Sequence, residues 1–126
     1  EAIASEGQTT LAIAADYGGQ WDMANAARQI AVQVAAGELS PEQVDVERVA
    51  QHLCLQDLPP VDMLVRTGGE LRISNFLLWQ SAYSELVFTD TLWPDFGENA
   101  LDAAVAEFES RQRRFGKTSE QVADGA

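Results

Sequence analysis

The sequence has very little of the chemistry that most hydrolases and zinc proteins use, with one cysteine, Cys54, and one histidine, His52, in 126 residues. A single thiol excludes an internal disulfide, and one cysteine with one histidine cannot supply an ordinary zinc site. The lone histidine also leaves little support for Ser-His-Asp catalysis. Both residues fall on a stretch with helical apolar spacing, so we interpret them as structural.

Positive charge is also scarce, because 8 Lys and Arg residues face 20 Asp and Glu residues, for a formal net charge of −12. Nucleic-acid binding relies on cations that neutralise phosphates, so we expect no nucleic-acid partner. The cations gather in two places, and local field decides binding in a pocket, so the pattern favours a small anionic ligand. These places are the Gly68-Gly69 turn, flanked by Arg66 and Arg72, and the C-terminal end, with Arg111, Arg113, Arg114 and Lys117.

Long apolar runs are absent as well. No run approaches the roughly 18 to 20 residues of a membrane span, and no signal-peptide pattern is present, so a cytoplasmic location is expected. The length and the 46% hydrophobic content suit one domain with a modest core. Because the sequence opens on Glu1, in a short helical piece over residues 1–4, we expect the start of a longer protein to lie outside it.

What is present predicts an α/β fold with a mostly parallel sheet flanked by helices. Residues 9–15 form an apolar run without alternation, typical of a strand covered on both faces. Gly18 and Gly19 follow it; they permit close backbone approach to a ligand, although a plain strand-to-helix turn explains them equally well. Apolar spacing then predicts a helix over 21–36, with Gly37 as its left-handed C-terminal residue.

The remaining elements are predicted from caps and breakers. Ser40-Pro41-Glu42-Gln43 matches a capping box, and Leu58-Pro59-Pro60 stops the helical pattern. Ser74 is suited to cap a buried helix, and the arginines near 115 suit a helix C-terminus. The predicted helices are a short one at 40–43 and others over 46–55, 75–80 and 99–115. The predicted strands are 61–66 and 86–88, 93–97 is a loop, and 117–126 is a disordered tail.

The segment from Val61 to Glu85 holds the chemistry. Arg66 ends a strand and Arg72 follows a double-glycine turn, so both can offer fork-shaped donors to phosphate or carboxylate oxygens. Ser74 adds a hydroxyl, and the helix that it caps would add backbone N–H groups. Together these features indicate a diphosphate site. Generic nucleotide binding is a weaker interpretation, because the P-loop and dinucleotide glycine patterns are missing.

Glu85 follows Ser74 by eleven residues, across a segment that is able to fold back toward the same loop. A carboxylate beside a diphosphate is repulsive unless a divalent cation bridges them, and Mg²⁺ does so with one or two carboxylates plus phosphate oxygens. A solvated charge at a helix end explains Glu85 equally well.

At this point the residues resemble a known family. The stretch DMLVRTGGELRISNFLLWQSAYSELVFTDTLWPDF, from Asp62 to Phe96, is similar to the C-terminal signature of the cis-prenyltransferases, and most similar to the bacterial members that make undecaprenyl diphosphate. The similarity extends from Thr10 to Gly116. It implies that residues 1–116 are the C-terminal half of a single cis-prenyltransferase domain.

The resemblance implies a role for each candidate residue. Arg66, Arg72 and Ser74 would hold the diphosphate of isopentenyl diphosphate, and Glu85 would help to bind Mg²⁺. The Arg-x-Gly tail would reach the active site of the partner subunit in a homodimer, and small or polar residues would shape the loop. The tail is Arg114-Phe115-Gly116, and the loop-shaping residues are Gly68, Gly69 and Asn75.

Two departures qualify these roles. Family members usually carry Asn and Arg at the ends of the Tyr-Gly-Gly turn, where this sequence has Asp16 and Gln20. The family's Asp-Gly-Asn-x-Arg-Trp loop, which carries the aspartate for Mg²⁺ and the allylic diphosphate, does not occur here. We therefore assign no catalytic residue, expect that aspartate in an N-terminal half, and expect the 126-residue chain alone to turn over no substrate.

The implied function is prenyl chain elongation. Isopentenyl diphosphate units would be condensed onto farnesyl diphosphate with cis geometry, giving undecaprenyl diphosphate, a cell-wall lipid carrier precursor that partitions to the membrane. The enzyme would be cytoplasmic or peripheral at the inner membrane. An alternative is a non-catalytic subunit of a heteromeric cis-prenyltransferase, and a third hypothesis, a phosphate-binding regulatory domain, rests only on the loop.

Overall fold

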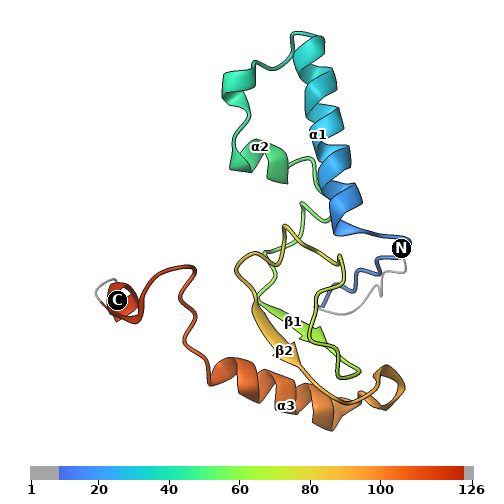
Figure 1. Ribbon diagram of the computed structural model, residues 1–126, viewed down its shortest axis with the longest axis vertical. Helices are drawn as coiled ribbons and strands as arrows, with labels where there is room; N and C mark the ends of the chain where they lie inside the picture. The colour runs from blue at the N-terminus through green and yellow to red at the C-terminus, as the bar shows by residue number, and fades with distance from the viewer. Residues whose placement is uncertain (1–8, 124–126) are drawn as a thin grey trace. The chain divides into compact units, whose positions relative to one another are not determined.

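The structure is a computed structural model that describes residues 9–123. The chain divides into two compact units, Glu1–Cys54 and Leu55–Ala126, which are described separately (Figure 1). The helical piece expected at 1–4 lies outside the described residues. Within 9–123, no helix has both the length and the apolar character that crossing a bilayer requires.

The first unit is built on α1 (Gly19–Ala35), close to the helix predicted over 21–36. The helix ends as predicted, because Gly37 adopts φ 74°, a left-handed conformation that glycine enters without steric cost. The N–H of Gly37 donates to the Val34 carbonyl at 3.0 Å, and the N–H of Glu38 donates to the Gln33 carbonyl at 2.9 Å. These bonds satisfy carbonyls that the last helical turn leaves without partners.

Two short helical segments follow in this unit. The capping box at Ser40 is confirmed, and the Ser40 N–H donates to Oε1 of Gln43 at 2.8 Å, but the segment is a single 3-10 turn, η1 (Pro41–Gln43). α2 (Val46–Ala50) begins at Asp45, whose carboxylate accepts from the Arg48 N–H at 2.8 Å. It ends earlier than the predicted residue 55, because residues 51–58 form successive turns.

The core of the first unit joins α1 to the residues around α2. It includes a buried carboxylate, Asp22, which accepts from the Tyr17 hydroxyl at 2.9 Å and from the Cys54 N–H at 2.9 Å. A carboxylate in the first turn is also stabilised by the helix dipole. The buried apolar residues of this unit are Ala26, Ile30, Leu39 and Leu53.

The predicted buried strand over 9–15 is wrong. These residues form no strand, and Leu11 and Ile13 are 69% and 73% exposed. A strand needs a neighbour for its backbone N–H and C=O groups. The two strands found in the described part of the chain pair with each other, and residues 9–15 pair with neither of them.

The second unit contains a parallel pair of strands, which confirms the α/β class. β1 (Met63–Arg66) and β2 (Glu85–Phe88) are in the register that places Met63 opposite Glu85 and Arg66 opposite Phe88. α3 (Glu98–Glu109) packs against β2 (Figure 1). The buried apolar residues here are Leu64, Val87 and Ala104.

The helix predicted over 75–80 is wrong, since residues 74–83 form turns and bends. Ser74, Asn75 and Leu77 adopt φ of 55°, 65° and 45°. A right-handed helix cannot continue through left-handed residues. The crossover between the parallel strands is therefore made without a helix.

The end of the chain also differs from its prediction. η2 (Trp93–Asp95) lies in the segment predicted as a loop, and α3 stops at Glu109 instead of reaching Phe115. Phe115 adopts φ 48°, so it does not extend the apolar stripe of the helix. Within the tail, α4 (Ser119–Ala123) is helical; disorder of the tail stays a prediction, and residues 124–126 lie outside the described range.

Candidate functional site

Arg66 stands at the carboxyl end of β1, where its strand delivers it to the sheet edge. The side chain is partly buried, and its Nε atom is buried without a hydrogen-bond partner among the described residues. A buried donor without a partner costs free energy comparable to a lost hydrogen bond. This atom is therefore a donor that an anionic ligand would satisfy.

The loop after Arg66 is held by the continuation of β2. The N–H of Gly68 donates to the Thr91 carbonyl at 2.9 Å, and the N–H of Gly69 donates to the Thr89 carbonyl at 3.0 Å. Both glycines are left-handed, with φ of 82° and 72°. At Gly69 there is also little room, since a Cβ would lie 3.2 Å from Oδ1 of Asp90. The double-glycine turn is thus a rigid backbone feature of this edge.

The other residues predicted for the loop are on the surface. Arg72 has a side chain that is 66% exposed and forms an ion pair with Glu70, and Ser74 and Asn75 are exposed. The helix N-terminus that Ser74 was expected to cap does not exist here. Arg72 and Ser74 thus share the β1-to-β2 connection with Arg66, but no helix dipole supports them.

Glu85 lies where the strands begin, which we call the amino edge of the sheet, and Arg66 lies where they end, the carboxyl edge. Glu85 begins β2 and pairs in register with Met63, three residues before Arg66. At about 3.3 Å per residue this is roughly 10 Å along the strands. The structure therefore does not bring Glu85 to the Arg66 loop. Oε2 of Glu85 instead lies 3.2 Å from Nη1 of Arg111, and the Glu85 side chain is 25% exposed.

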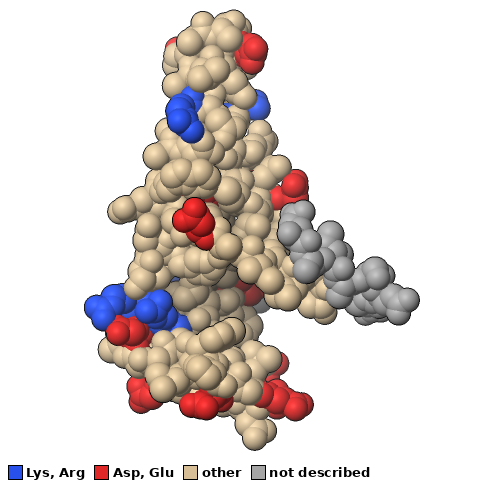
Figure 2. All heavy atoms as spheres, turned by 90° about the vertical axis from the view of Figure 1, so that its right-hand side faces the viewer, with Lys and Arg blue, Asp and Glu red and all other residues tan. Residues whose placement is uncertain are grey.

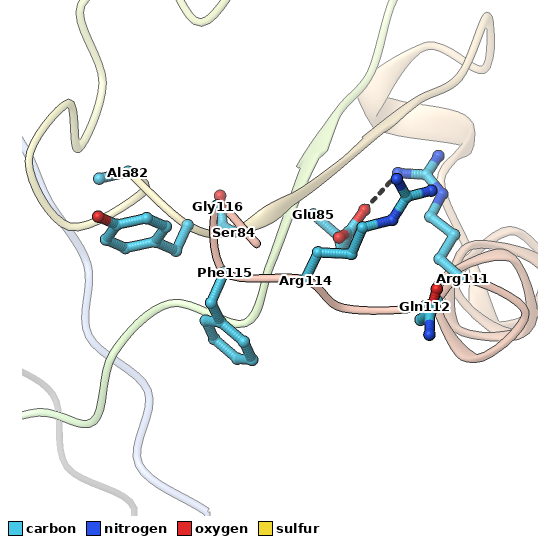
Figure 3. Close-up of a pocket in the computed structure, with 9 residues that line it drawn as sticks. Ala82, Ser84, Glu85, Arg111, Gln112, Arg114, Phe115 and Gly116 are labelled. Atoms are coloured by element: carbon cyan, nitrogen blue, oxygen red, sulfur yellow. Dashed lines mark hydrogen bonds and ion pairs between the residues drawn. The ribbon is translucent and has the colours of Figure 1, made fainter. Parts of the chain in front are cut away.

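Glu85 lines an open pocket of about 580 Å³ formed with the C-terminal tail. Figure 3 shows Arg111 and Arg114 extending from the tail toward the Glu85 carboxylate. The pocket unites three of the predicted site residues, Glu85, Arg114 and Gly116. Its lining consists of Ala82, Tyr83, Ser84, Glu85, Arg111, Gln112, Arg114, Phe115 and Gly116.

Arg111 was not predicted as a site residue, although it is central to this pocket. Its Nη1 donates to the Leu86 carbonyl at 2.7 Å and to Glu85, and its Nη2 pairs with Glu107. The hydrogen bonds to Glu107 and then to Glu85 raise the pKa of Arg111. The four-residue spacing of Glu107 and Arg111, which brings helical side chains together, was the signal in the sequence.

A second pocket, of about 380 Å³, belongs to the first unit and includes the Tyr-Gly-Gly turn. Asp16, Tyr17, Gly18 and Trp21 line it. The Tyr17 hydroxyl donates to the buried Asp22, so the ring is fixed from the protein side. Gln20, one of the two departures from the family pattern, is exposed beside this turn.

His52 and Cys54 have structural surroundings. Nδ1 of His52 lies 2.8 Å from the Arg48 carbonyl, so it must donate, and Nε2 accepts from the amide nitrogen of Gln33 at 3.1 Å. Burial raises the pKa of the Cys54 thiol, and the hydrogen bond with Asp22 adds to the shift. A thiol held in its neutral form is a poor nucleophile.

Charge is unevenly distributed on the surface. On the face shown in Figure 2, basic side chains form a few small groups, acidic ones are scattered, and most of the visible surface carries neither sign. Among residues 9–123, no three His, Cys, Asp or Glu side chains are grouped so that they could hold a metal ion.

Comparison with protein families finds a match over residues 1–116 to the profile described as "Putative undecaprenyl diphosphate synthase". A ditrans,polycis-undecaprenyl-diphosphate synthase ((2E,6E)-farnesyl-diphosphate specific) of Pseudomonas syringae is 60% identical over 116 residues, which cover 92% of this chain and 46% of that protein. The enzyme of the same name from Escherichia coli K12 is 57% identical over 109 residues, 86% of this chain and 43% of that protein. The chain thus spans less than half the length of these relatives.

Solved structures of similar proteins also match most of this chain and less than half of their own length. Lavandulyl diphosphate synthase from Lavandula x intermedia, in complex with dimethylallyl diphosphate, matches with a TM-score of 0.77 and 45% identity, covering 80% of this chain and 44% of that one. A probable undecaprenyl diphosphate synthase from Campylobacter jejuni matches with a TM-score of 0.65 and 35% identity, over the same shares of the two chains.

Proposed function

Because this chain belongs to the prenyltransferase family of undecaprenyl diphosphate synthases, we propose that it carries the isopentenyl diphosphate site of a cis-prenyltransferase. The reaction condenses isopentenyl diphosphate units onto farnesyl diphosphate with cis geometry. Its product is undecaprenyl diphosphate, the precursor of a cell-wall lipid carrier. The enzyme works in the cytoplasm and its product partitions to the inner membrane.

The observation that best supports this proposal is the state of Arg66 at the carboxyl end of β1. A buried guanidinium Nε without a described partner lies beside a double-glycine turn that β2 holds in place. Arginine matches the oxygens of a diphosphate through paired, charge-assisted hydrogen bonds. The ligand would supply the acceptor that this atom lacks.

Arg72 and Ser74 complete the site in this proposal. Both are exposed on the same connection, so they are accessible to a ligand, and Arg72 would exchange Glu70 for the diphosphate. With the diphosphate held, the alkene of isopentenyl diphosphate is oriented toward the allylic carbon. Orientation of this kind is a large part of what a condensation between two bound substrates needs.

Mg²⁺ is the proposed cofactor, with Glu85 as one ligand. A single carboxylate fits this ion, which is commonly bound by one or two carboxylates together with substrate phosphates. When bound, the cation would neutralise diphosphate charge. Arg111 must move before the ion binds, because its Nη1 forms an ion pair with the Glu85 carboxylate.

The working enzyme is proposed to be a homodimer in which Arg114 and Gly116 act at the partner's active site. Both residues are exposed in their own chain, which supports this role. A non-catalytic subunit of a heteromeric enzyme is the alternative. The presence of Arg66, Arg72, Ser74 and Glu85 together favours the catalytic form.

The test is made in a full-length synthase that carries this chain as its C-terminal half. We expect Arg72→Ala to lower kcat/KM for isopentenyl diphosphate by about 10- to 100-fold, because charge-assisted bonds to phosphate are lost. The KM for farnesyl diphosphate should change less than about threefold.

Arg28→Ala is the matched control, because Arg28 is an exposed arginine of α1 that bonds to the Asn25 side chain. It should leave both substrates unaffected. Equal losses for the two substrates in Arg72→Ala would remove Arg72 from the isopentenyl diphosphate site. A wild-type protein that makes no product unless another subunit is added would favour the alternative.

A further inference from the structure

The tail after α3 contains two adjacent arginines with different surroundings. Arg114 lines the pocket and extends toward Glu85 (Figure 3), whereas Arg113 does not line it. Nη1 of Arg113 forms an ion pair with Asp62, the residue before β1. The Arg113 side chain is 25% exposed, although the rest of the tail from 112 to 117 is exposed.

Arg113 also connects the helix to the turn of the tail. Its guanidinium carbon lies 5.7 Å from the ring centroid of Phe108, on α3, and 4.5 Å from that of Phe115. Both distances lie within the range of a cation–π interaction. Phe115 is left-handed, with φ 48°, and lines the pocket together with its neighbours Arg114 and Gly116. Fixing its ring therefore fixes the turn.

Asp62 is bonded both to Glu85, which lines the pocket, and to Arg113, the neighbour of Arg114 in the tail. Its side chain holds Arg113, and its backbone carbonyl accepts from the N–H of Glu85 at 2.9 Å. The turn itself is closed by the N–H of Lys117, which donates to the Arg114 carbonyl at 2.8 Å. One residue thus joins the start of β2 to the tail.

We propose that Asp62 and Arg113 are a positioning pair that holds Arg114 and Gly116 at the Glu85 pocket. Neither member of the pair lines the pocket, so they act through the residues that they orient. The effect on the pocket follows from the contacts alone, and the effect on catalysis rests on the proposed function.

The experiment uses the full-length synthase with Asp62→Asn, Arg113→Met and the double variant. Each single change should lower kcat/KM for isopentenyl diphosphate by about 10- to 100-fold, the scale of a small misplacement of catalytic groups. The double variant should be no worse than the weaker single variant, because residues that act as a pair are not additive. Asp62→Glu and Arg113→Lys should recover activity to within about fivefold of wild type.

Asp57→Asn is the matched control, since Asp57 is an exposed carboxylate of the same unit, and it should change kcat/KM by less than about twofold. Amide hydrogen exchange supplies a readout that does not need activity. Asp62→Asn should raise exchange in residues 111–117 while β1 and β2 keep their protection.

Each outcome decides the proposal. Single variants within twofold of wild type, additive losses in the double variant, or conservative variants as poor as the disruptive ones would overturn it. Equal loss of protection in β1 and β2 would also overturn it, because it would show a general structural role. If the wild-type synthase does not condense isopentenyl diphosphate, the proposed function fails, and the exchange measurement still decides whether the pair holds the tail.

Discussion

The two edges of the small parallel sheet differ in how their charged side chains are paired. At the carboxyl edge, Arg66 presents a buried Nε atom without a described partner, beside a turn whose shape is set by backbone hydrogen bonds. At the amino edge, Glu85 is already paired with Arg111, which is shared with Glu107. Arg66 thus lacks an anion at one edge, whereas the Glu85 carboxylate at the other edge already has a cation.

The difference indicates which edge is ready for a ligand. A preformed donor without a partner gains a hydrogen bond when an anion arrives, so little reorganisation opposes binding. A carboxylate that is already paired must first lose its partner, and that loss reduces the net gain. We therefore expect the carboxyl edge to contribute most of the substrate affinity. The contribution of the amino edge depends on whether the Glu85–Arg111 ion pair is broken.

The most demanding test of this comparison is an activity assay of the 126-residue chain alone. If the two edges were sufficient, the 126-residue chain would elongate farnesyl diphosphate with labelled isopentenyl diphosphate. We expect no polyprenyl product, since the aspartate for Mg²⁺ and the allylic diphosphate is expected outside this chain. The full-length synthase is the positive control, and product from the chain alone would contradict the proposal that half of the site lies outside it.

Removal of the unpaired donor is expected to have the next largest effect. In the full-length synthase, Arg66→Ala should lower kcat/KM for isopentenyl diphosphate by about 100- to 1,000-fold, since two hydrogen bonds to a charged group are worth about 3 to 4 kcal/mol in total. The exposed Arg72 should matter less than Arg66. Steady-state kinetics compare both with Arg28→Ala, and an Arg66 variant less affected than Arg72→Ala would reverse our ranking.

At the amino edge, Glu85→Gln should lower activity by about tenfold, and excess Mg²⁺ should restore part of the loss, because the amide still offers one oxygen to the ion. Rates measured across a Mg²⁺ titration test this. Glu107→Gln is the control, since it removes the other carboxylate on Arg111 without touching the proposed ligand. An unchanged Mg²⁺ dependence in Glu85→Gln would count against Glu85 as a ligand.

The smallest effect concerns the backbone of the carboxyl edge. Gly69→Ala should lower the free energy of unfolding by about 1 to 2 kcal/mol, because alanine is strained at a positive φ. Gly68→Ala has the same strain but meets nothing within 4 Å, whereas the new Cβ at Gly69 meets Asp90. Denaturant unfolding of the two variants isolates that contact, and equal losses would show that Asp90 moves aside freely.

Several parts of the fold were predicted from local patterns. The α1 boundaries, the Gly37 terminus, the Ser40 capping box and both paired strands are confirmed. These features depend on residues close in sequence, such as a glycine at a left-handed position or a side chain that caps its own turn. The errors are segments whose apolar pattern needs a partner: among the described residues, 9–15 form no strand, and 74–83 form turns and bends.

The chemical groups of the candidate site can be recognised in the sequence: two arginines around a double-glycine turn, an Arg-x-Gly tail and one carboxylate, in an order that resembles one family. Which of these groups meet depends on how the chain folds. Strand register places Arg66 and Glu85 at opposite edges, and the early end of α3 brings Arg111 and Arg114 to Glu85. The physical reason is that residue types set what a side chain can bind, whereas register and chain reversals, which depend on distant contacts, set where it lies.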